Sequence, residues 1–227
     1  MKKNLLFIAI IIASLNTVNA QQKVKFGLQA GYLLGSSLFT DEDGLSYGTT
    51  TSKSGFRIGV NASIPIGTSL VFNPEINYVN KGSKNAIDVP GFGVSIENSF
   101  TANYIEVPLN ILYNIPSKNE GFYIGAGPTI SMGLNGKGTL SGNSMGMPIN
   151  STYLVKFDGK TEDELPITDE DVHLRKFELG ANILAGYKLK NGLNFRLNYN
   201  FGISDMDPNA DGGNKNRYVA LTVGFSF

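Results

Sequence analysis

Apolar and polar residues alternate through eight segments of this sequence, and almost no stretch repeats its apolar residues at helical spacing. In the last segment, Val219, Leu221, Val223, Phe225 and Phe227 alternate with small or polar residues. Because successive side chains of a β-strand point to opposite faces, this pattern predicts strands with one apolar and one polar face. The predicted strands cover residues 24–34, 55–66, 70–81, 102–115, 121–134, 176–189, 193–204 and 217–227.

The connections between these segments alternate between short and long. The short ones are 67–69, 116–120 and 190–192, and the long ones are 35–54, 82–101, 135–175 and 205–216. In an antiparallel meander, successive connections lie at opposite ends, so the short turns share one end and the long loops the other. This asymmetry and the even strand number are typical of bacterial outer-membrane barrels. We therefore predict an all-β fold, an eight-stranded antiparallel up-and-down transmembrane β-barrel whose first strand pairs with its last.

The polar face of the predicted strands carries their charges. These are Arg57, Glu75, Glu106, Glu178, Lys188 and Arg196. A lysine or arginine that faces lipid at the midplane costs about 2–4 kcal/mol, so this face is expected to turn inward. An eight-stranded barrel is only wide enough to be filled by side chains, which predicts paired interior charges and negligible conductance. Two roles stay open for these charges: a structural network, or a path for protons or solutes.

The distance of each charge from its short turn predicts two layers inside the barrel. Arg57, Glu106 and Glu178 lie farther from the short turns and are expected to share a layer near the long loops. Glu75 and Arg196 lie only a few residues from the short turns and are expected to share a second layer.

Aromatic residues cluster at both ends of the predicted strands, as in two interfacial girdles. Toward the short turns lie Phe72, Tyr113, Phe122, Tyr187, Phe195 and Phe225, and toward the long loops lie Tyr32, Phe56, Tyr78, Phe177 and Phe201. The alternative is a soluble, lipocalin-like carrier, which needs a charged outer surface, whereas the polar face here is mostly Gly, Asn and Ser. Pro74, Pro108 and Pro128 interrupt the strands, and we expect local β-bulges there.

Residues 1–20 have the layout of a secretory signal peptide, with two lysines at the start, an apolar run over 5–15 and a small residue at Ala20. The apolar run is shorter than the roughly 20 residues that span a bilayer. We predict cleavage after Ala20 and one barrel domain, residues 21–227, in the outer membrane. The sequence has no cysteine, which excludes a cysteine-linked lipid anchor and disulfides. Its net charge of zero gives no indication of a nucleic-acid partner.

His173 is the one histidine of the sequence and lies at the loop end of the sixth predicted strand. Barrel enzymes that act on lipid A or peptides use a histidine with Ser or Asp at the outer rim, which makes Ser151 and Asp171 its candidate partners. The sequence shows no recognisable spacing among them. A solvated loop histidine is therefore the favoured interpretation.

Two loop segments are candidate cation sites. Asp207, Asn209, Asp211 and Gly212 match the first half of a calcium loop, but Tyr218 stands where the bidentate glutamate belongs. The acidic run 161–173 is a candidate site for divalent ions that bridge lipopolysaccharide. In both cases a solvated loop is the favoured interpretation, and no catalytic, cofactor-binding or metal-binding residue is assigned.

Several stretches resemble a known family: "INYVNKG", "YIEVPLNILYNI", "FYIGAGPTISMG", "FELGANILAGYKL" and "NRYVALTVGFSF". They are similar to the outer-membrane β-barrel proteins of Bacteroidota, the PorT-like group. The resemblance covers essentially all of residues 21–227 and implies an eight-stranded barrel. Most members have no assigned function, and PorT itself is associated with a protein-secretion system.

The sequence thus predicts a non-catalytic, monomeric outer-membrane protein without an open pore and without a cofactor. Its long extracellular loops are expected to serve a structural or interaction role. The expected partners are outer-membrane lipid and lipopolysaccharide, together with envelope or secretion proteins. The alternatives are an enzyme that acts on outer-leaflet lipid and a component associated with a protein-secretion system.

Overall fold

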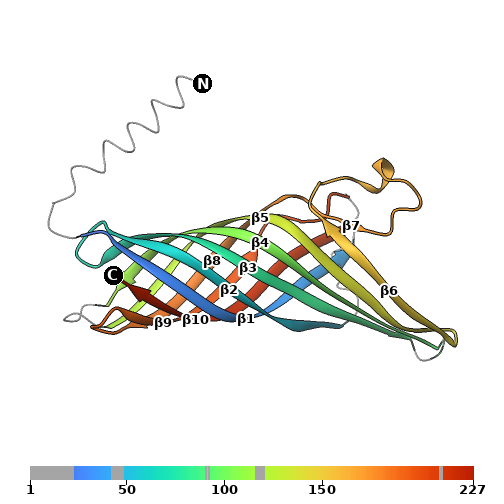
Figure 1. The fold of residues 1–227 in the computed structure, drawn as a ribbon, viewed down its shortest axis with the longest axis horizontal. Helices are drawn as coiled ribbons and strands as arrows, with labels where there is room; N and C mark the ends of the chain where they lie inside the picture. The colour runs from blue at the N-terminus through green and yellow to red at the C-terminus, as the bar shows by residue number, and fades with distance from the viewer. Residues whose placement is uncertain (1–22, 42–48, 90, 92, 116–120, 210–211) are drawn as a thin grey trace, which may run out of the picture.

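A computed structural model describes residues 23–41, 49–89, 91, 93–115, 121–209 and 212–227. In this part of the chain, eight antiparallel strands close into a tilted barrel (Figure 1). The ring strands are β1 (Lys25–Asp41), β2 (Thr49–Pro65), β3 (Leu70–Val89), β4 (Val94–Asn114), β5 (Gly121–Ser144), β8 (Phe177–Lys188), β9 (Leu193–Gly202) and β10 (Gly212–Ser226). The predicted all-β barrel is confirmed. The predicted signal peptide, residues 1–20, lies outside the described residues, and no described helix is long and apolar enough to cross a membrane.

The first and last strands complete the ring. β1 pairs with β10 in a continuous antiparallel register that sets Leu28 opposite Phe225 and Leu34 opposite Val219. The backbones of Phe26 and Phe227 exchange two hydrogen bonds of 3.2 and 2.9 Å at the end of this ladder. The closing strand therefore leaves no open edge, as predicted from the even strand number.

The apolar face of the strands points outward and the polar face inward. On β10, for example, Leu221 is 60% exposed whereas its neighbour Thr222 is 1% exposed. Arg57, Glu75 and Glu106 are buried inside the barrel. This orientation is the one predicted for a barrel in lipid, and it is the reverse of a soluble carrier with an apolar interior.

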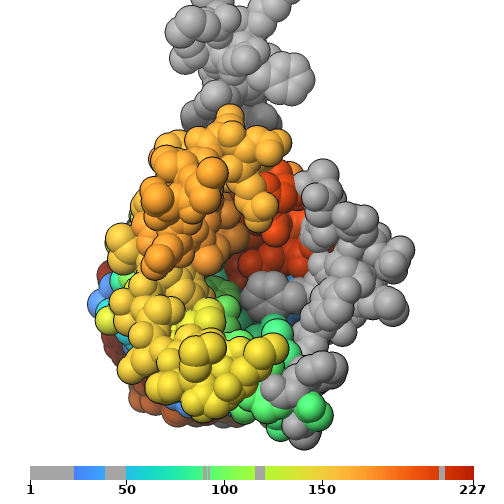
Figure 2. Space-filling view, turned by 90° about the vertical axis from the view of Figure 1, so that its right-hand side faces the viewer, coloured from blue at the N-terminus to red at the C-terminus, as the bar shows by residue number. Residues whose placement is uncertain are grey.

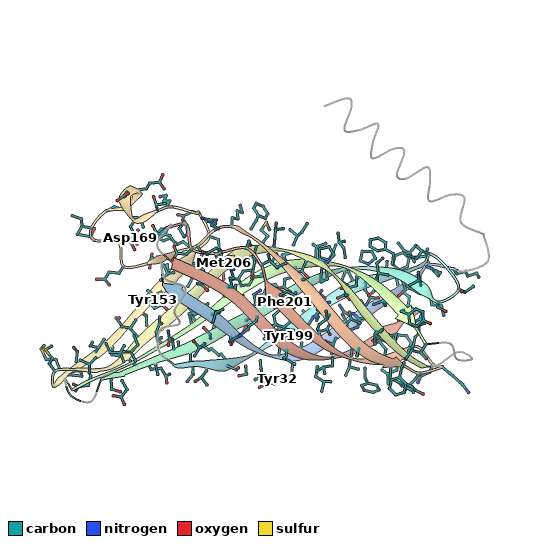
Figure 3. The ribbon with its side chains drawn as sticks, turned by 180° about the vertical axis from the view of Figure 1, so that it is seen from behind. Tyr32, Tyr153, Asp169, Tyr199, Phe201 and Met206 are labelled. Atoms are coloured by element: carbon teal, nitrogen blue, oxygen red, sulfur yellow. The ribbon has the colours of Figure 1, made fainter. Side chains whose placement is uncertain are left out.

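Aromatic side chains lie on the outside of the barrel near both ends of the strands. Toward the long loops, Tyr32 faces Phe56 across the β1–β2 ladder, and Phe56 packs against Tyr78 with ring centroids 6.0 Å apart. Tyr32, Tyr199 and Phe201 follow this level of the barrel in Figure 3. Toward the short turns, the rings of Phe122 and Tyr187 meet edge to face at 4.7 Å.

A wall of strands rises beyond the barrel at its long-loop end (Figure 1). β3, β4 and β5 continue past the ring, and β6 (Met147–Lys156) pairs with the free part of β5. β7 (Val172–His173) pairs parallel to β6, and a short 3-10 helix, η3 (Glu162–Glu164), lies between them in sequence. The expectation that residues 82–101 and 135–175 form loops is therefore wrong for much of their length. Exposed polar residues such as Lys84 and Glu97 lie along the wall, so its strands carry no regular apolar alternation.

The three strand prolines leave the strand register unchanged. The residue pairing continues in step past Pro74, Pro108 and Pro128, so the expectation of bulges at these positions is wrong. Each proline removes one backbone donor instead. At Pro74 the loss is offset by a side chain, because the Asn73 amide donates to the Ala62 carbonyl over 2.8 Å, and Ala62 lies opposite Pro74 in the register.

The register shifts occur higher, where the ring meets the wall. One lies between Ser52 and Phe56 in the β2–β3 ladder, and the other lies at Asn103 and Tyr104 in the β4–β5 ladder. Bulges bend a strand and are common at barrel rims. These shifts therefore mark the level at which the wall leaves the cylinder.

Candidate functional site

Glu75 is the centre of a polar cluster in the lower half of the barrel, nearer the short turns. Arg57 Nη2 lies 2.9 Å from Glu75 Oε2, and Arg196 Nη1 pairs with Glu75 Oε1. Three buried amides also donate to the carboxylate: Gln29, Asn77 and Asn110. We call Glu75, Arg57 and Arg196 the lower charge layer.

Lys81 is the centre of a second cluster, above the first. Its Nζ lies 2.8 Å from Glu106 Oε1 and 3.2 Å from Glu178 Oε2. The ammonium also lies over the ring of Tyr104, 4.3 Å from the centroid, and the hydroxyl of Tyr218 donates to Glu106 over 2.6 Å. We call Lys81, Glu106 and Glu178 the upper charge layer.

The two predicted layers are partly right. Glu75 and Arg196 share one layer, and Glu106 and Glu178 share the other. The placement of Arg57 in the layer near the long loops is wrong, because its long side chain bonds to Glu75 in the lower layer. The cation of the upper layer is Lys81, which the sequence analysis missed.

Alternation along β3 contained the signal for Lys81. Glu75, Asn77, Val79 and Lys81 occupy every second position and all are buried. The predicted third strand ends at Lys81, with a loop expected from residue 82 onward. The continuation of β3 to Val89 places it in mid-strand instead.

An apolar cap closes the barrel above the upper charge layer. It is a buried cluster that consists of Ala102, Tyr104, Val155, Phe157, Leu174 and Met206. Phe157 packs edge to face on Tyr104 at 5.3 Å, and it occupies the space that a side chain at Gly133 would need. Backbone hydrogen bonds hold the β6–β8 connection in place, including Arg175 N–H to the Met206 carbonyl at 2.8 Å. Viewed from this end, the orange connection lies over the barrel mouth (Figure 2).

His173 belongs to this connection and is 8% exposed, so the interpretation as a solvated histidine is wrong. Its Nδ1 lies 2.8 Å from Asp158 Oδ1, and its Nε2 lies 3.5 Å from Asp169 Oδ2. Asp169 is labelled at this end of the molecule in Figure 3. The histidine is therefore set between two carboxylates.

The candidate partners of His173 lie elsewhere. In the β6 ladders, Ser151 pairs with Leu140 whereas His173 pairs with Lys156, five positions further along β6. At about 3.3 Å per residue the two levels are roughly 16 Å apart, too far for a serine–histidine pair. Asp171 pairs with Lys156 Nζ at 2.8 Å instead. Hydrogen bonds from the Lys156 ammonium and from a backbone N–H hold the pKa of Asp171 below its ordinary value.

The calcium-loop candidate is a set of local turns. Asp207 accepts hydrogen bonds from the backbone and side chain of Asn209, and Asn209 accepts one from the Glu162 N–H. Tyr218, at the position of the missing glutamate, points into the barrel and bonds Glu106. Asp211 lies outside the described residues. Among the residues that the structure describes, no group of three or more His, Asp or Glu side chains is arranged to hold a metal ion.

A family model described as an outer membrane protein beta-barrel domain matches residues 19–207. No curated protein matches the sequence. Among solved structures, the chain is similar to Neisserial surface protein A, with 14% identity over 91% of this chain and 100% of that chain and a TM-score of 0.45. It is also similar to Ail, the attachment invasion locus protein of Yersinia pestis, with 13% identity over 91% of this chain and 100% of that chain and a TM-score of 0.43. A third structure is the outer membrane enzyme PagL, with 12% identity over 85% of this chain and 98% of that chain and a TM-score of 0.36.

Proposed function

The chain belongs to the outer membrane protein beta-barrel domain family, and we propose that it is a non-catalytic barrel without an open pore that serves interactions at the cell surface. It resides in the outer membrane. The proposed partners are outer-membrane lipid, lipopolysaccharide and proteins of the envelope, with the barrel acting as a monomer. The mature chain is proposed to begin after removal of residues 1–20.

The occupied interior is the observation that carries this proposal. The two charge layers and the apolar cap fill the space through which a solute would have to pass. An eight-stranded barrel has no spare width beside such side chains. A structural network is thus better supported than a proton or solute path.

Planar bilayers test the closed barrel directly. The purified protein is expected to give no stable single-channel currents, while a porin reconstituted in the same way serves as the positive control. Regular current steps that scale with the amount of protein would overturn the proposal.

The tip of the wall supports the interaction role. Met145 is 71% exposed and Met147 is 67% exposed. Met145 lies on the turn that joins β5 and β6, and Met147 is the first residue of β6, beyond the barrel. Flexible, polarisable methionine side chains are over-used at protein-binding surfaces. This apolar tip has no role in the packing of the barrel, which supports a contact with another molecule.

Cross-linking in the native envelope, followed by purification, tests this role. Replacement of Met145 and Met147 by Ser is expected to remove the captured partner and to leave the barrel folded. Ile167→Ser is the matched control, since Ile167 is an exposed apolar residue of the β6–β8 connection. Equal capture by the double variant and the control would contradict a role of Met145 and Met147 in binding the partner.

We further propose that the chain is a PorT-like protein of Bacteroidota. The stretches that carry this resemblance form β3, β4, β5, β8 and β10 of the ring. An association with a protein-secretion system is an alternative form of the interaction role. In the cross-linking experiment it predicts capture of secretion proteins, whereas a surface or lipid role predicts none.

One observation favours the enzyme alternative, namely the setting of His173 between Asp158 and Asp169. The separation of Ser151 from this histidine supports the non-catalytic proposal instead. Incubation with lipid A decides between them: we expect unchanged lipid for both the wild type and His173→Gln. Lipid A modified by the wild type alone would establish the enzyme.

A further inference from the structure

We propose that the outer face of the wall binds a phosphorylated headgroup of an outer-leaflet lipid. A groove of about 390 Å³ crosses this face between β2, β4, β5 and β6. Its polar lining includes two lysines and four aliphatic hydroxyl side chains: Lys53, Lys137, Ser99, Thr101, Thr139 and Thr152. Tyr153 and one carboxylate, Asp171, also line it. Ammonium and hydroxyl groups both donate hydrogen bonds to phosphate oxygens, so this set of donors matches a phosphate.

The groove lies on the side of the wall that continues the lipid-facing surface. Ser99 and Thr101 lie six and four positions before the lipid-facing Ile105 on β4, and the register with β3 is unbroken between them. Because side chains alternate along a strand, both residues lie on the same face as Ile105. Lys137 and Thr139 lie opposite Thr101 and Ser99 in the β4–β5 ladder, so they share this face. The Lys53 ammonium reaches the same surface and donates to the Ser99 hydroxyl over 2.8 Å.

The height of the groove matches the headgroup region. Lys53 lies three residues beyond Phe56 of the outer aromatic level, and Lys137 lies three residues beyond the exposed Leu134. Three residues of a tilted strand rise about 8 Å. The headgroup region extends roughly 5–8 Å from the hydrocarbon on each side. Both ammonium groups are therefore placed where lipid phosphates lie.

The charges at the groove are left unbalanced. Within the described residues, neither Lys53 nor Lys137 forms an ion pair. Glu97 pairs with Lys84 over 3.0 Å, and Asp171 pairs with a lysine of β6 over 2.8 Å, so both nearby carboxylates are engaged. Lys137 and Lys84 lie close enough to Lys53 for their charges to repel, and the Glu97 carboxylate opposes this repulsion in part. An anion between Lys53 and Lys137 would relieve this repulsion, which a neutral or zwitterionic lipid does poorly.

This inference rests on the proposed exposure of the wall at the cell surface and names the lipid partner more closely. Native mass spectrometry of the full-length protein, released from detergent micelles, tests it with lipid A, dephosphorylated lipid A and inorganic phosphate. The experiment measures lipid binding alone. A negative result here would therefore contradict the lipid site without bearing on the conductance or cross-linking experiments.

We expect the wild type to retain lipid A and to lose dephosphorylated lipid A. The double variant K53Q/K137Q is expected to retain lipid A about tenfold less, since it removes two charge-assisted hydrogen bonds. K160Q is the matched control, because Lys160 is an exposed lysine of the β6–β8 connection, and it should bind as the wild type does.

Three outcomes would overturn the proposal: equal retention of lipid A and its dephosphorylated form, equal retention by K53Q/K137Q and the wild type, or inorganic phosphate bound as tightly as lipid A. The last outcome would assign the groove to a free anion. Heat-modifiable gel mobility checks that the double variant is folded. If the variant does not fold, the comparison of lipid A with dephosphorylated lipid A on the wild type still tests the proposal.

Discussion

The lower charge layer surrounds one carboxylate with two guanidinium groups, whereas the upper charge layer surrounds one ammonium with two carboxylates. Taken alone, each layer carries a surplus charge, positive below and negative above. Together, the three cations and three anions balance. The comparison shows that the net charge of these six residues is zero only when the two layers are counted together. It also shows that the ion pairs of each layer all involve its central residue.

The two layers also differ in how they hold their cations. Below, planar guanidinium groups reach the Glu75 carboxylate among amide side chains, which supply further directional hydrogen bonds. Above, the compact ammonium of Lys81 sits under the rings of Tyr104 and Tyr218, next to the apolar cap. Amide side chains thus supply most of the further contacts in the lower layer, whereas two tyrosines supply them in the upper layer.

Removal of the two central residues should have the largest effect and should separate the layers by pH. Glu75→Gln leaves two buried guanidinium groups, which cannot lose their protons, so the loss of about 3–5 kcal/mol should not change between pH 5 and pH 8. Lys81→Met leaves two buried carboxylates, which can take up a proton, so its loss should shrink as the pH falls. Urea unfolding in lipid micelles, followed by heat-modifiable gel mobility, measures both. The same pH dependence in both variants would contradict the distinction between the layers.

Removal of a peripheral member of the lower layer should have a smaller effect, and an interior lysine outside both layers provides the comparison. Arg57→Ala removes one of the two cations that pair with the buried Glu75 carboxylate, so it should lower the free energy of unfolding by about 3 kcal/mol. Lys188→Ala should cost less than about 1 kcal/mol, because Lys188 is half-buried at the mouth near the short turns. Equal urea midpoints for the two variants would show that water fills the interior and that the charges are unpaired.

The cap provides a third test, confined to the upper end. A methyl group at Gly133 would overlap the ring of Phe157, so Gly133→Ala should loosen the β6–β8 connection at a cost of about 1–3 kcal/mol. Limited proteolysis should then cut this connection faster. Gly67→Ala is the control at a short turn, where the nearest atom to the added carbon lies 3.9 Å away. If Gly133→Ala leaves the rate of proteolysis of the connection unchanged, the cap does not depend on the packing of Phe157 against Gly133.

Acid should have the smallest effect, and we expect it at the partly buried ion pair of Lys156 and Asp171 among others of the β6–β8 connection. Because the pKa of Asp171 is lowered in the folded chain, its pair stabilises the connection above the ordinary pKa and is lost as the pH falls through the lowered value, below about pH 4. Hydrogen exchange at the Leu154 amide, which donates to Asp171, should rise there. Lys156→Gln should reduce this response, and an identical response in that variant would exclude the pair as its cause.

Much of the fold followed from the alternation of residues. The number of strands in the ring, the inward polar face and the pairing of the first ring strand with the last were all predicted correctly, because each strand must present apolar side chains to hydrocarbon on one face. The wall was not predicted. Beyond the membrane, exposed polar residues such as Lys84 and Glu97 interrupt the apolar alternation of β3 to β6, so no period marks these segments as strands. Lys81 was missed because the third strand was predicted to end there, although Lys81 continues the buried alternation of Glu75, Asn77 and Val79.

The sequence by itself determined which face of each strand meets lipid and most of the residues that carry charge into the interior. Only the tertiary structure decided which charges meet. Strand tilt and the lengths of Arg57 and Lys81 set those partners, and neither is visible in a pattern of period two. The same holds for His173 and for the groove at Lys53 and Lys137, because their neighbours come from strands far apart in the chain. Local alternation reports the solvent on each side of a strand, while contacts between strands depend on how the closed sheet is sheared.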